Sequence, residues 1–204
     1  MQSFRVRAVS VDEFVTTKGQ KIQALHDAQV AVRRPDRLRT DRVGPVADAI
    51  FRYDGKSFSV YGKRTGYYAT APAPRTIDAA IDDARERFGI DAPAADLLLS
   101  QPYEALMEDV VSGRYVGLEP IDGVPCHHLA FQGKDTDWQI WIQDGRPLPR
   151  RYVITSKDVD GQPEYTVSLA SWEPDAPLAD DTFSFQPPPG STRIDFIPQS
   201  KGNR

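Results

Sequence analysis

Asp-Gly pairs recur four times along the chain, and each lies between segments with the character of β-strands. They stand at positions 54–55, 122–123, 144–145 and 160–161. An Asp-Gly pair in this setting is a strong signal for a β-hairpin, because the turn requires positive φ angles that Gly adopts without steric cost. Since a hairpin joins neighbouring antiparallel strands, the sequence predicts a mainly antiparallel sheet built as a meander.

The middle of the chain, at about residues 76–110, has the pattern of a short helical insert. Thr76 is a suitable N-cap for a helix, and Gly89 is a suitable stop. The apolar residues between them recur at the spacing of one helical face: Ile77, Ala80, Ile81, Ala84 and Phe88. Two further short helices are predicted at residues 94–100 and 103–110, after which strands resume.

The order of strands, helices and strands indicates an α+β fold with the helices on one face of the sheet. About ten strands are expected, and a strongly twisted sheet of that size curls. We therefore predict a strongly curved antiparallel sheet whose concave face is covered by the helical insert. The 204 residues fit one domain, with a frayed tail at about residues 199–204.

The curved sheet and the insert together predict an apolar cavity between them. Apolar residues alternate with polar ones in segments 57–60 and 138–143, so one sheet face is apolar at both places. The helices must bury their leucines against that face. The predicted cavity residues are Phe58, Val60, Leu97, Leu98, Leu106, Met107, Trp138, Ile140 and Ile142. The alternative is that the aromatic residues are ordinary sheet core, because aromatic side chains favour strands.

The residue types that usually carry chemistry form no catalytic or metal-binding pattern. Cys126 and His128 share one face of a predicted strand, whereas His127 lies on the other, and two ligands do not make a zinc site. The segment 55–57 resembles the end of a phosphate-binding loop, but Ile50 stands where that loop requires Gly. We therefore interpret these residues as structural and expect no enzymatic activity, no cofactor and no metal.

The net charge of −4 gives no basic footprint for nucleic acid, so no nucleic-acid partner is expected. Basic residues still gather in the first strands: Arg5, Arg7, Lys18, Lys21, Arg33, Arg34, Arg37, Arg39 and Arg42. A solvated sheet face explains them most simply, and a patch that contacts anionic lipid headgroups is the alternative. The single Cys allows no internal disulfide and does not define the compartment. We expect a monomer.

Several stretches resemble a family of predicted periplasmic bacterial proteins of unknown function. They are residues 52–61, 66–69, 96–103, 122–131, 137–142 and 147–155, and the likeness runs from about residue 30 to residue 185. This family is similar to the superfamily of LolA-like and LolB-like lipoprotein carriers, which also includes mycobacterial lipid-carrying lipoproteins and a periplasmic sensor of stray lipoproteins. The resemblance implies an unclosed antiparallel half-barrel with helices over an apolar cavity.

The resemblance also implies a function at the bacterial cell envelope. The first hypothesis is a periplasmic protein that binds lipid or the acyl chains of a lipidated protein. The second is a protein-interaction or sensor domain whose cavity is filled by its own side chains. Members of the family usually have a leader and a first helix before the opening strand. Neither precedes residue 3 here, so we expect that a leader has been removed.

Overall fold

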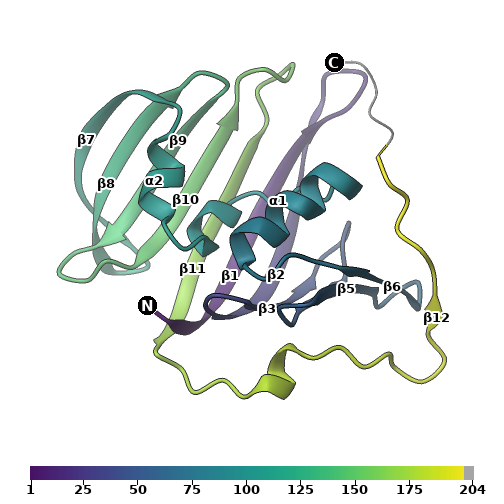
Figure 1. Cartoon of the computed structure of the whole chain (residues 1–204). Coiled ribbons are helices and arrows are strands. Elements are labelled where there is room, and N and C mark those ends of the chain that lie inside the picture. The colour runs from purple at the N-terminus through teal and green to yellow at the C-terminus, as the bar shows by residue number, and fades with distance from the viewer. Residues whose placement is uncertain (200–204) are drawn as a thin grey trace.

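Residues 1–199 are described by a computed structural model, in which twelve strands form one sheet (Figure 1). The strands are β1 (Ser3–Val15), β2 (Lys21–Arg33), β3 (Arg37–Val43), β4 (Ala49–Tyr53), β5 (Ser57–Gly62), β6 (Tyr67–Pro72), β7 (Val110–Ile121), β8 (Val124–Gly133), β9 (Thr136–Gln143), β10 (Pro149–Ser156), β11 (Glu164–Pro174) and β12 (Thr192–Arg193). The helices are α1 (Ile77–Phe88) and α2 (Pro102–Met107), with the 3-10 helices η1 (Ala95–Leu98) and η2 (Asp180–Phe183).

The sheet consists of two meanders, β1–β6 and β7–β11, which meet where β1 pairs with β11. All four Asp-Gly pairs lie at hairpin turns, and their glycines have φ angles between 68° and 84°. The hairpin prediction is therefore confirmed. Every pairing is antiparallel except that of β12 with β6, which is parallel.

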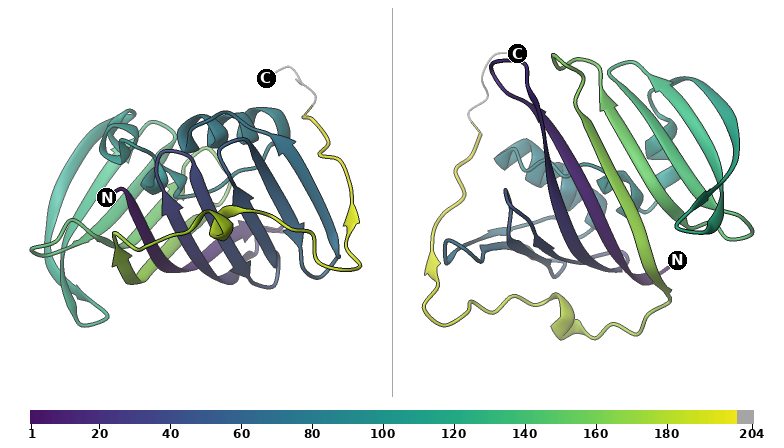
Figure 2. Two further views of the ribbon diagram at one scale, coloured as in Figure 1. Left: turned by 60° about the horizontal axis from the view of Figure 1, so that its bottom comes forward. Right: turned by 180° about the vertical axis from the view of Figure 1, so that it is seen from behind.

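The sheet is strongly curved and not closed, and the helical insert lies within its concave side (Figure 2). Thr76 caps α1 by accepting a hydrogen bond from the backbone N–H of Ala79 at 3.2 Å, and Gly89 ends the helix in the left-handed region. The buried face of α1 joins the main core, together with residues from both meanders. The predicted α+β unclosed half-barrel is confirmed. Within residues 1–199, no helix combines the length and the apolar character needed to cross a membrane.

Residues 175–199 form a C-terminal strap that runs across the convex side of the sheet, pairs with the β6 edge through β12 and then reaches α1 (Figure 2). Phe183 in η2 is fully buried and packs with Ala31 of β2. The only helical turn in the described part of the strap is η2. The predicted frayed tail lies outside the described residues except for Gln199, whose backbone N–H donates to Arg87 O at 2.8 Å.

His26 of β2 is almost completely buried, with a side chain that is 1% exposed. Its Nδ1 lies 2.8 Å from Asp12 Oδ2 and 2.8 Å from an Arg42 nitrogen. Gly44 lies directly against the ring, because a Cβ at that position would come within 2.0 Å of His26 Cδ2. Burial lowers the pKa of His26, and Arg42 lowers it further, whereas Asp12 opposes both effects.

Phe183→Ala should reduce the free energy of unfolding by about 3–5 kcal/mol, because it removes a fully buried aromatic ring that attaches the C-terminal strap to β2. Urea denaturation measures the loss. The control is Ile197→Ala in the same strap, since Ile197 is 86% exposed, and its effect should stay within about 0.5 kcal/mol. Equal effects of the two substitutions would contradict the attachment.

The stability of the protein should fall as the pH drops below about 6.5, and His26 should account for part of this fall. Its lowered pKa means that the unfolded chain binds a proton more readily than the folded one in this range. The difference in unfolding free energy between wild type and His26→Gln should therefore shrink between about pH 7.5 and about pH 5.5. A difference that does not change with pH would show that His26 is not responsible.

Candidate functional site

A cleft of about 710 Å³ lies between the start of β1, the β9–β10 turn and the segment from η1 to α2. That segment lies on the concave side of the sheet (Figure 1). Ligand pockets commonly measure roughly 300–1,000 Å³. The exposed side chains of Tyr103 and Arg146 line the cleft, so it is open to solvent. Its apolar surface comes mainly from Phe4, Leu97, Leu106, Ile140, Ile142, Leu148 and Trp172.

The floor of the cleft is set by strand pairing. Alternation along β9 turns Ile140 and Ile142 toward the same face. Phe4 at the start of β1 lies beside Trp172 at the end of β11, with ring centroids 5.4 Å apart. The indole N–H of Trp172 donates to Pro149 O at 3.0 Å, which fixes the ring against β10. These contacts make a firm apolar floor.

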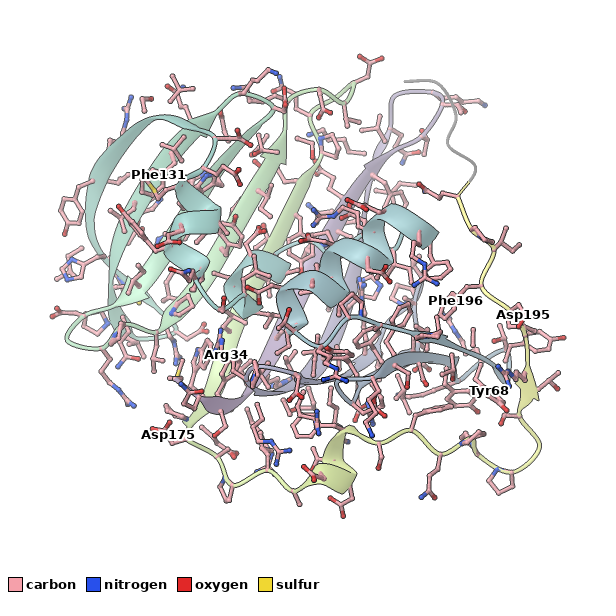
Figure 3. The ribbon with its side chains drawn as sticks, viewed as in Figure 1. Arg34, Tyr68, Phe131, Asp175, Asp195 and Phe196 are labelled. Atoms are coloured by element: carbon pink, nitrogen blue, oxygen red, sulfur yellow. The ribbon has the colours of Figure 1, made fainter. Side chains whose placement is uncertain are left out.

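The opposite wall is made by η1 and α2, which are only four and six residues long. Leu97 of η1 and Leu106 of α2 line the cleft and remain partly exposed. Arg34, in the turn after β2, donates hydrogen bonds to Leu98 O at 3.0 Å and Leu99 O at 2.7 Å. Figure 3 shows Arg34 beneath this wall. Its guanidinium therefore connects the end of η1 to the sheet.

The nine predicted cavity residues all belong to one apolar cluster, but they do not all lie at the cleft. Four of them line it: Leu97, Leu106, Ile140 and Ile142. Leu98, Met107 and Trp138 pack in the same cluster outside the cleft lining. Phe58 and Val60 lie on β5, which is separated from β9 in the sheet order by β4, β3, β2, β1, β11 and β10. Contact of any of them with a ligand remains a prediction.

On the concave side of the sheet, the region around Phe58 of β5 is filled by the protein's own side chains, and we call this region the sealed wing. Phe58 is fully buried, and its ring centroid lies 5.8 Å from Phe51 and 5.9 Å from Phe88 of α1. Phe196 of the C-terminal strap completes the cluster, 5.2 Å from Phe58 and 4.8 Å from Phe88. Figure 3 shows Phe196 arriving from the strap. One half of the concave side is thus sealed, whereas the other half holds the open cleft.

Sequence reasoning missed several cleft residues: Phe4, Arg34, Arg146, Leu148 and Trp172. Phe4 had a signal, because it alternates with arginines in the first strand. Leu148 lies in the turn before β10, and Trp172 lies near the end of β11, so alternation is no guide to either of them. The contacts of Trp172 with Pro149 and Phe4 place its ring at the cleft. The arginines carried no local signal for a cleft.

The Cys126–His128 segment makes contacts that fit a structural role. Cys126 is fully buried, and burial raises the pKa of its thiol, which disfavours a thiolate nucleophile. His128 stacks on Trp141 with ring centroids 4.0 Å apart, and its Nε2 lies 3.0 Å from Gln139 Oε1. His127 points to the other face and contacts Asp144. Residues 1–199 hold no group of three or more potential metal-ligating side chains.

The basic residues of the first strands are mostly paired with acids. Arg7 pairs with Asp27, and Lys21 pairs with Glu13 at 2.8 Å. Further ion pairs are Arg5–Glu173, Arg33–Asp180, Arg37–Asp36, Arg39–Asp41 and Arg42–Asp12. This neutralisation favours the solvated sheet face over a basic patch for lipid headgroups.

Solved structures that are similar to this one are distant in sequence. An uncharacterised conserved protein from Thermus thermophilus has a TM-score of 0.53 at 12% identity, with 94% of this chain and 90% of that protein covered. MucB has a TM-score of 0.50 at 16% identity, and the match covers 91% of this chain but only 58% of MucB. A LolA superfamily protein from Nitrosomonas europaea has a TM-score of 0.45 at 12% identity, with 90% of each chain covered.

No curated protein matches the sequence. The family of predicted periplasmic proteins known as DUF2092 matches residues 1–197, which is nearly the whole chain. The fold, the resemblance of the hairpin motifs and this match agree. The chain therefore belongs to the DUF2092 family of periplasmic proteins.

Proposed function

We propose that this periplasmic protein binds lipid, or the acyl chains of a lipidated protein, in the cleft, and that it catalyses no reaction. The observation that carries the proposal is the open cleft of about 710 Å³ with a mainly apolar lining. Each buried methylene group of an acyl chain contributes about 0.8 kcal/mol, so a long chain gains substantial affinity from such a surface without specific polar contacts.

The wall formed by η1 and α2 supports this proposal. Its leucines are only partly buried, so they make fewer contacts with the sheet than core residues do. An acyl chain that enters between Leu106 and Ile142 replaces exposed apolar surface with apolar contacts on both sides. The sealed wing around Phe58 meanwhile keeps the fold stable without a ligand.

A protein-interaction or sensor domain is the second candidate, and the sealed wing is the observation that favours it. Phe196 and Phe88 already occupy the space over Phe58 that a larger cavity would need. On this alternative the open cleft receives a side chain or a lipidated segment of a partner protein instead of a free lipid. MucB, which shares the fold, has been solved in complex with MucA.

The wild-type protein should take up a fluorescent fatty-acid probe, and Leu106→Asp should weaken this uptake about tenfold or more, because it places a charge on the apolar wall. Fluorescence titration measures the dissociation constants. Leu118→Asp is the matched control, since Leu118 on β7 is 56% exposed and does not line the cleft. Circular dichroism should show an intact sheet in both variants.

Native mass spectrometry of protein purified without detergent provides an independent measurement, and a lipid mass bound to the protein is expected. A wild-type protein that takes up no probe and carries no lipid would exclude lipid binding and leave the interaction domain as the better proposal. Equal loss of uptake in Leu106→Asp and Leu118→Asp would place the binding site outside the cleft.

A further inference from the structure

The charged side chains that line the cleft are all cationic, although the chain as a whole is acidic. They are Arg34 and Arg146, and no Asp or Glu belongs to the lining within residues 1–199. The whole sequence has 29 acidic and 25 basic residues apart from histidine, so a lining without acids departs from the general balance. An apolar surface with cationic side chains complements a molecule that has an apolar tail and a negative head.

Neutral carbonyl groups hold the positively charged side chain of Arg34 in place, and no carboxylate in direct contact neutralises it. Its guanidinium donates to three neutral carbonyls, which are Met1 O at 2.9 Å and those of Leu98 and Leu99. Its Cζ lies 5.6 Å from the centre of the Phe4 ring, which forms part of the cleft floor. In the described part of the chain, no carboxylate forms an ion pair with Arg34.

Asp78 attracts Arg34 electrostatically but forms no ion pair with it. The hydrogen bonds of the Asp78 carboxylate go to Ser100 instead. Its carboxylate accepts hydrogen bonds from the Ser100 backbone N–H at 3.1 Å and from Ser100 Oγ at 2.6 Å. Arg34 Nε is buried and makes no hydrogen bond to any described residue. A headgroup therefore cannot reach this nitrogen, and the contact with a ligand falls to the Nη atoms, of which Nη1 donates only to Met1 O among the described residues.

Arg146 contributes the second charge from the turn between β9 and β10. Its backbone is fixed by hydrogen bonds, since its N–H donates to Gln143 O at 3.2 Å and its carbonyl accepts from Leu148 N at 2.7 Å. Its side chain is exposed and makes no hydrogen bond or ion pair with residues 1–199. The neighbouring Asp144 instead contacts His127 at 3.1 Å. The guanidinium of Arg146 is thus available to a ligand.

We infer that the cleft selects amphiphiles with an anionic headgroup, a carboxylate or a phosphate, which Arg34 and Arg146 bind while the acyl chain lies against Leu106, Ile140 and Ile142. This inference rests on the proposed lipid-binding function and specifies its ligand class. Guanidinium groups form short, charge-assisted hydrogen bonds to carboxylate and phosphate oxygens, and these bonds are stronger than neutral ones. A neutral lipid of the same chain length gains only the apolar contacts.

The test compares dansyl-undecanoic acid with its methyl ester, because the two probes share a chain and differ in headgroup charge. The wild-type protein should bind the acid about tenfold more tightly than the ester, as expected for one charge-assisted contact. Arg146→Gln should weaken binding of the acid more than binding of the ester, because the ester makes no charge-assisted contact, and it should therefore reduce this preference. Salt should weaken acid binding and not ester binding.

Arg75→Gln is the matched control, because Arg75 is exposed, lies outside the cleft lining and forms no ion pair within the described chain. It should retain the full preference for the acid. Arg34→Lys keeps a charge where Arg34→Gln does not. The lysine variant should therefore retain more of the preference than the glutamine variant, and ester binding reports whether the cleft is intact in each.

Displacement of the bound acid probe distinguishes the two headgroups. Laurate and lysophosphatidate are the anionic competitors, and monoacylglycerol is the neutral one. Displacement by either anion at a lower concentration than by monoacylglycerol supports the inference, and the better anion identifies carboxylate or phosphate. Equal binding of acid and ester by the wild type would overturn the headgroup inference and leave lipid binding intact. Binding of neither probe would instead overturn the proposed function itself.

Discussion

The pairing of β1 with β11 is the contact on which the rest of the structure depends. It runs from Phe4 opposite Pro174 to Asp12 opposite Tyr165, and it joins the first strand of one meander to the last strand of the other. Without it, each meander would expose a long edge strand with unpaired backbone groups. The same register places Phe4 beside Trp172, so the floor of the cleft depends on the junction between the two meanders.

Local signals in the sequence predicted the elements well, and long-range contacts explain what they missed. The four hairpins follow from Asp-Gly pairs and α1 follows from Thr76 and Gly89, because both signals act within a few residues. The β1–β11 pairing joins residues far apart in the chain, such as Arg5 and Glu173 at a separation of 168 positions, and leaves no local pattern. The C-terminal strap has no periodicity either, since it is attached by single side chains such as Phe183.

The predicted site shows the same difference between what local sequence patterns predict and what long-range contacts decide. Strand alternation placed Ile140 and Ile142 on the core face, and helical insertion brought Leu97 and Leu106 opposite them, so these four line the cleft. Alternation gives the face of a side chain but not what covers that face. Phe58 satisfied the same rule and is instead covered by Phe88 and by Phe196 from the strap. Which half of an apolar face stays open is thus decided by segments without a repeating pattern.

Arg34 combines two roles that are usually separate. The last carbonyls of a short helix lack partners within the helix, and Arg34 satisfies those of Leu98 and Leu99 at the end of η1. The position of the cleft wall therefore depends on a residue whose charge also faces the cleft. The Arg146 side chain makes no comparable contacts within residues 1–199, since only its backbone is hydrogen-bonded there. The shape of the cleft and its preference for a headgroup are consequently coupled at Arg34 and separable at Arg146, so the charge at Arg146 can be altered without moving the wall.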